Sequence, residues 1–154
     1  MLRRVLVSFA LIGMLLLGKA YALVTDQMIM TRSDQGFPET MVSLQLAIRK
    51  QGYTLSRVQR VDIGLTSSGY QTDKYRVVFF GKTDEIHELT RKHPELIPYL
   101  PLKIAIFAEG DHTIMVTTNP QVFADMYPDQ DLKPLFQRWQ KDVINILNSV
   151  HFSE

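Results

Sequence analysis

The 154-residue sequence contains no cysteine. The absence excludes disulfide bonds, a thiolate nucleophile and a lipid anchor attached to cysteine. Exported proteins commonly gain stability from disulfides in an oxidising compartment. If this chain is exported, packing alone must hold its fold.

The sequence also lacks a large excess of charge of either sign. It has 17 Lys and Arg against 16 Asp and Glu, and the balance becomes 14 against 16 once residues 1–22 are left out. Nucleic acid and anionic membrane surfaces are bound through clustered positive charge. Neither is therefore a predicted partner, and membrane contact is expected only through the N-terminal segment if that segment is not cleaved.

No known catalytic motif is present. No two of the four histidines have the spacing of metal ligands on one helix or strand face, and His87-Glu88 begins a zinc protease motif that ends in Arg91 instead of histidine. The sequence predicts no catalytic residues and no cofactor, and it favours a protein that is not an enzyme. An enzyme whose groups meet only in space stays open.

Residues 1–22 have the features of a signal peptide. Arg3 and Arg4 precede an apolar run over residues 5–17, and Ala20-Tyr21-Ala22 has the small residues that signal peptidase requires. We predict cleavage after Ala22 and a periplasmic or secreted protein. The alternative is an uncleaved anchor, although the run is shorter than the roughly 20 residues that span a bilayer.

The remaining residues, 23–154, are long enough for one domain with a proper core. Alternating apolar residues in Tyr75–Gly81 predict a central strand with both faces covered. A short polar helix follows at 84–93, then an extended crossing at 96–101 where Pro98 and Pro101 lack backbone donors. Residues 102–118 form a predicted β-hairpin that turns at Glu109–Asp111.

The rest of the chain completes a two-layer α+β sandwich. We predict a mainly antiparallel or mixed sheet of four or five strands that includes 28–30 and 53–62, the latter bulged or at an edge. Helices are expected near 38–51, 120–126 and 131–149. Val42 and Leu46 are predicted to widen the buried stripe of the first of these helices. The last helix has an amphipathic stripe that either completes the core or docks a partner: Leu132, Leu135, Phe136, Trp139, Val143, Ile146, Leu147 and Val150.

Two stretches offer candidate binding residues. Met28 and Met30 share a strand face and are either thioether ligands for cuprous copper or core residues that fill gaps. The stretch from Gly64 to Tyr70 resembles a phosphate-binding loop in its glycine spacing but lacks the required lysine, so it is predicted to be a mobile connection. The candidate ligand-binding residues there are Thr66, Ser67, Ser68 and Tyr70.

Several short motifs resemble the family called domain of unknown function 302, over about residues 28–126. They are Gly52-Tyr53, Tyr75-Arg76-Val77, Pro94-Glu95-Leu96, Leu100-Pro101, Ile104 to Gly110 and Thr118-Asn119-Pro120. The resemblance implies a compact α/β domain, often a homodimer, with no established activity. Many members carry cysteines where this chain has Leu102 and the residues around Gly81, so a thiol-based function is excluded here.

Three functions stay open. The first is an exported accessory module that binds a small ligand or an envelope protein through the sheet face or the Gly64–Tyr70 stretch. The second is a periplasmic copper-handling protein, and the third is a small enzyme with an unrecognised site.

We predict that the protein isolated from its host's envelope begins at Leu23. Replacing Ala22 by arginine should retain residues 1–22, because signal peptidase requires a small residue there. Intact mass spectrometry distinguishes the two forms. A wild-type envelope protein that keeps residues 1–22 would show that the segment is an anchor.

Overall fold

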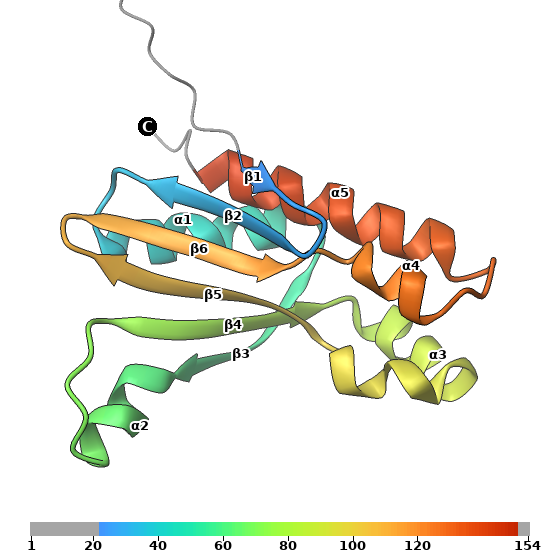
Figure 1. The fold of residues 1–154 in the computed structure, drawn as a ribbon, viewed down its shortest axis with the longest axis horizontal. Coiled ribbons are helices and arrows are strands. Elements are labelled where there is room, and N and C mark those ends of the chain that lie inside the picture. Colours follow the sequence, from blue (N-terminus) through green and yellow to red (C-terminus); the bar gives the residue numbers. More distant parts are fainter. Residues whose placement is uncertain (1–21, 151–154) are drawn as a thin grey trace, which may run out of the picture.

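The computed structural model describes residues 22–150, which form one sheet and its helices (Figure 1). The predicted signal peptide therefore lies outside the described residues except for Ala22, whose backbone N–H donates to Asn148 Oδ1 at 2.7 Å. No helix in residues 22–150 combines the length and the apolar character needed to cross a bilayer. In chain order the elements are β1 Leu23–Val24, β2 Met28–Ser33, α1 Phe37–Lys50, β3 Thr54–Arg60, α2 Val61–Ser67, β4 Tyr75–Gly81, α3 Thr83–Lys92, the 3₁₀ helix η1 Pro94–Tyr99, β5 Leu102–Glu109, β6 His112–Thr118, α4 Val122–Met126 and α5 Lys133–Val150.

The sheet has six strands in the order β1-β2-β6-β5-β4-β3, and every neighbouring pair is antiparallel. The α+β class is confirmed, while the predicted number of four or five strands is too low. The two-residue strand β1 is too short to show an alternating pattern. Figure 1 shows α1 and α5 together behind the strands, with no helix in front of them.

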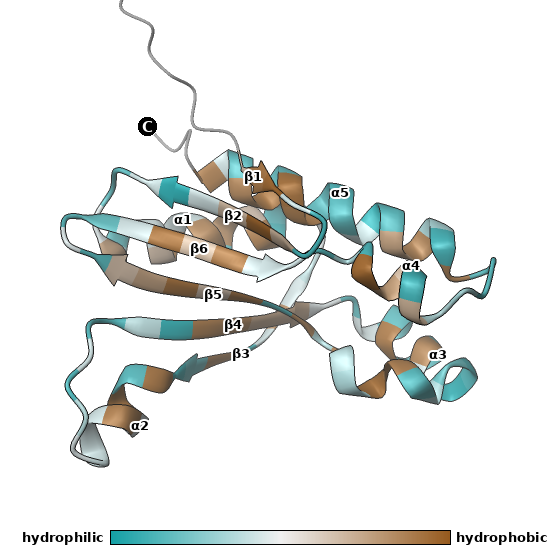
Figure 2. Ribbon diagram, in the orientation of Figure 1, coloured by the Kyte–Doolittle hydropathy of each residue, from teal (hydrophilic) through white to brown (hydrophobic). Residues whose placement is uncertain are grey.

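Alternation along the strands turns one set of side chains toward α1 and α5. Ile29, Ile104 and Ile106 are fully buried on this side and meet the apolar stripe of α5. The predicted stripe of α5 is buried apart from the half-buried Leu135, which confirms that it completes the core. Figure 2 shows apolar segments along the central strands and along α5.

Two glycines take the left-handed conformation that their positions demand. Gly52 (φ 84°) ends α1, where a residue of positive φ lets the chain turn into β3. Gly110 (φ 59°) lies in the tight turn between β5 and β6. The predicted helix end and the predicted hairpin are both confirmed.

The structure corrects two predicted connections. The crossing at 96–101 is partly helical, because the turns of η1 need donors only from residues that are not proline: Leu96 donates to His93 and Leu100 to Ile97. The predicted mobile connection begins inside α2, which contacts β4. A seven-residue helix with one glycine offers too short a pattern to be recognised.

Val42 and Leu46 on α1 are 56% and 58% exposed, so they do not widen the buried stripe as predicted. They lie on the arc of the helix that faces away from the sheet.

β3 is an edge strand whose register shifts between Leu55 and Arg57, which confirms the predicted bulge and edge position.

We predict that Phe136→Ala lowers the free energy of unfolding by about 3–5 kcal/mol. Phe136 is fully buried, with ring centroids 5.7 Å from Phe123 and 5.8 Å from Trp139. Leu46→Ala is the matched helix control, and its effect should stay within about 0.5 kcal/mol because the side chain is exposed. Urea unfolding measures both. Equal losses in the two variants would contradict the core described here.

Candidate functional site

The side of the sheet that faces away from α1 and α5 carries apolar side chains. Register places Met30, Val116, Ala105 and Val77 in one row across β2, β6, β5 and β4. Residues directly opposite one another across paired strands share a face. We call this surface the open face, and its apolar residues are Met28, Met30, Tyr75, Val77, Phe79, Ala105, Phe107, Ile114 and Val116.

The open face is hollowed. One hollow of about 430 Å³ lies over Val77, Phe79 and Ala105, and we call it the sheet hollow. At one end of the strands a second hollow of about 320 Å³, the end hollow, lies among η1, α4, α5 and the strand ends. Its apolar lining includes Tyr99, Phe123 and Met126. Each volume falls within the range of small-ligand sites.

Three cations border the open face. Arg32 lies 3.5 Å from Glu109, so its charge is paired. Lys103 of β5 and Arg57 of β3 both lie opposite Phe79 of β4, and neither forms an ion pair within residues 22–150. The face therefore has an apolar centre and two unpaired positive charges.

Met28 and Met30 lie on this face and are 51% and 37% exposed. The prediction that they share a face is confirmed, but the interpretation that they fill gaps in the core is wrong. Within residues 22–150, no three His, Asp or Glu side chains lie close enough together to hold a metal ion. Two thioethers are the soft ligands that the open face itself offers.

The other predicted site residues lie on and just after α2. The Ser67 and Ser68 hydroxyls donate to the Gly64 carbonyl at 2.8 and 3.1 Å, so they close the end of that helix. Thr66 and Tyr70 are exposed. These four residues line neither the sheet hollow nor the end hollow.

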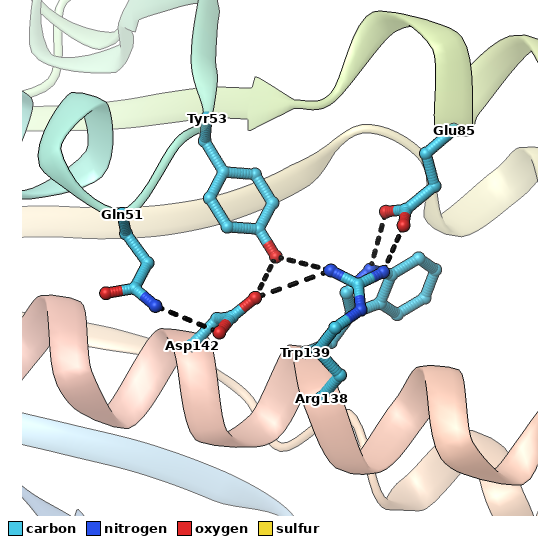
Figure 3. Close-up of polar contacts among 6 residues, drawn as sticks. All are labelled: Gln51, Tyr53, Glu85, Arg138, Trp139 and Asp142. Carbon is cyan, nitrogen blue, oxygen red and sulfur yellow. Dashed lines mark hydrogen bonds and ion pairs between the residues drawn. The ribbon is translucent and has the colours of Figure 1, made fainter.

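A buried polar cluster joins α5 to the start of β3, and the sequence analysis missed it (Figure 3). The carboxylate of Asp142 accepts hydrogen bonds from Tyr53 Oη at 2.7 Å and Gln51 Nε2 at 3.0 Å. Arg138 Nη1 lies 3.4 Å from both Asp142 Oδ2 and Tyr53 Oη.

The same arginine extends the cluster to α3. Arg138 Nη2 pairs with Glu85 Oε2, and the other oxygen of Glu85 accepts a hydrogen bond from Trp139 Nε1 at 3.0 Å. In Figure 3 the side chains of Arg138 and Asp142 rise from one face of α5 and meet Glu85 and Tyr53 between the elements. Every member of the cluster has its partner inside the protein.

The family model for the domain of unknown function DUF302 matches residues 29–150. The chain belongs to the DUF302 family. The match includes α5, which lies beyond the segment that showed the resemblance in the sequence.

A crystal structure of an uncharacterised conserved DUF302 protein from Bacillus stearothermophilus is similar to this chain. The TM-score is 0.72 at 17% sequence identity, and the alignment covers 80% of this chain and 97% of that one. At that identity the likeness shows the shared fold alone. No curated protein matches the sequence.

In this DUF302 domain the polar cluster acts as a structural tie. Burial, followed by the hydrogen bond to Asp142, raises the pKa of Tyr53 well above its usual value of 10.0. A tyrosine that holds its proton so firmly donates a hydrogen bond and does not serve as a base near neutral pH. The sequence did contain one indication of the cluster: Asp142 occupies a stripe position of α5, three residues after Trp139 and four before Ile146.

We predict that Tyr53→Phe lowers the free energy of unfolding by about 1–3 kcal/mol near neutral pH, since Asp142 loses a donor. The difference between wild type and variant should shrink above about pH 10. There the unfolded chain loses the tyrosine proton while the folded protein keeps it, so rising pH favours unfolding of the wild type, by at most about 1.4 kcal/mol per pH unit.

Urea unfolding of both proteins between pH 7 and pH 11 measures this difference. Tyr70→Phe is the control, because Tyr70 is exposed and removal of its hydroxyl should leave the stability unchanged. A constant difference between wild type and Tyr53→Phe over the whole range would contradict the buried, proton-holding role of Tyr53.

Proposed function

We propose that this DUF302 protein is an exported, non-enzymatic binding module, and that its binding surface is the open face. One observation carries the proposal: an apolar sheet face that no helix of the described chain covers (Figure 1). An antiparallel sheet with one solvated face ordinarily presents polar residues there. Large exposed apolar patches mark surfaces that bind a ligand or partner.

The geometry of the face also supports binding. Tyr75 and Phe107 lie edge to face, with ring centroids 6.4 Å apart, beside the smaller Ala105 and Val77. The larger side chains thus stand around a lower centre formed by Ala105 and Val77, and this difference in height produces the hollow in the face. Because these residues belong to paired strands, the surface is held by the backbone ladder and needs little ordering upon binding.

The alternative of a small enzyme has less support. The ionisable side chains around Asp142 and Arg138 are engaged with one another and with Glu85 and Tyr53. Lys82 Nζ lies 4.8 Å from the centre of the Tyr53 ring and adds a cation–π contact to that group. Tyr53 and Asp142 are buried and held by these partners, so they are not presented to a substrate.

A copper-handling role is the second candidate. It is favoured by the exposed thioethers of Met28 and Met30, which lie two residues apart on one strand face. His112 lies on the same side of the sheet opposite Glu109, but it is four residues from Val116, the register partner of Met30, and its Nδ1 lies 3.3 Å from Asp34 Oδ1. A copper ion at the two methionines would therefore need a ligand from elsewhere. The stretch Thr66, Ser67, Ser68 and Tyr70 is a weaker proposal for a ligand site, because both serine hydroxyls are already engaged.

A charge placed at the centre of the open face should prevent the binding of its ligand or partner. We predict that protein isolated gently from its host carries a bound mass or a partner in native mass spectrometry, and that Val77→Asp removes it. Desolvating an unpaired carboxylate opposes binding by several kcal/mol.

Val42→Asp is the matched control, because Val42 is an exposed valine on the outer side of α1. It should retain the bound species, and circular dichroism should show that both variants are folded. Wild-type protein that carries nothing, or equal loss in both variants, would overturn the proposal.

A further inference from the structure

Lys103 lies where the two hollows meet. The sheet hollow and the end hollow share three lining residues, Lys103, Thr117 and Thr118, and both are otherwise mainly apolar. The shared residues come from the start of β5 and the end of β6. A cation is thus placed between two apolar surfaces.

Two of the three shared residues have polar groups without a partner in residues 22–150. Within residues 22–150, the Lys103 ammonium forms no ion pair and the Thr118 hydroxyl forms no hydrogen bond. Thr117 is occupied, since its hydroxyl donates to the Lys103 carbonyl at 2.6 Å. The junction therefore offers donors to an anion from Lys103 and Thr118.

The charges of the open face favour an anionic occupant over a second copy of the chain. Two copies packed face to face would bring together four cations, two Lys103 and two Arg57 side chains. The carboxylates left to neutralise them would be the two Asp73 side chains, because each Glu109 is already paired with Arg32. Burying unpaired cations is costly. An anionic ligand would neutralise the same charge.

On the basis of the proposed function, we infer that the open face binds an amphipathic carboxylate with an unbranched alkyl chain. Its head group lies at Lys103 and Thr118, and its chain lies in the sheet hollow over Val77 and Ala105. Charge-assisted hydrogen bonds are stronger when apolar surface excludes water from around them. The alkyl chain gains from leaving water in proportion to the area that it buries.

Isothermal titration of the protein with dodecanoate, below its micelle concentration, tests this inference. Dodecanol and dodecyltrimethylammonium keep the chain and change the head group. We expect dodecanoate to bind, dodecanol to bind at least about tenfold more weakly, and the cation to show no detectable binding. A charge-assisted hydrogen bond contributes enough for a factor of ten or more.

Lys103→Gln should weaken dodecanoate binding at least about tenfold and leave the affinity for dodecanol unchanged. Lys141→Gln is the matched control, since Lys141 is an exposed lysine on α5, and it should behave as wild type. The glutamine variant keeps a long polar side chain at an exposed position, so its folding should be unaffected.

Equal affinity for dodecanoate and dodecanol, no effect of Lys103→Gln, or no binding of dodecanoate would each overturn the inference. None of these results bears on the proposed function. That function is tested by the bound mass or partner in protein isolated from the host and by its loss in Val77→Asp. Sedimentation supplies a further test: a dimer that Val77→Asp dissociates and Val42→Asp leaves intact would show that a second copy occupies the open face, which also overturns the inference.

Discussion

The packing of α5 and α1 against a single face of the sheet is the constraint on which the rest of the structure depends. Ile104 and Ile106 of β5 are fully buried against these helices, while Lys103, Ala105 and Phe107 of the same strand point the other way. Because side chains alternate, every strand that supports the core also contributes to the opposite face. The position of two helices thus decides which residues can bind.

Much of the fold follows from local patterns in the sequence. The stripe of α5 repeats at steps of three and four residues, and Gly52 and Gly110 stand where the chain needs a positive φ. The broken alternation before Asp62 predicted the bulge and edge position of β3 correctly. These features depend on neighbours within a few residues, so the sequence alone specifies them.

The candidate site depends on long-range arrangement, and the sequence could not specify it. Val77 and Phe79 alternate with buried residues in a strand that reads as apolar on both faces, and local pattern does not tell which face the helices leave uncovered. Tyr53 and Asp142 are 89 residues apart and meet because α5 packs against α1, whose C-terminal end leads into Tyr53. The prediction that Met28 and Met30 share a face is correct. Their exposure could not be predicted, because it depends on which face of the sheet the helices leave uncovered.

The edges of the sheet are protected while its face is not. β1 has two residues, and β3 is bulged and carries Arg57 and Arg60, features that discourage pairing with another chain. An apolar face is an equal risk for association. Met30, Val77 and Phe107 nevertheless lie on a face that no helix of residues 22–150 covers, while the buried side of the same strands supplies the core. That apolar character supports the binding role proposed for the face.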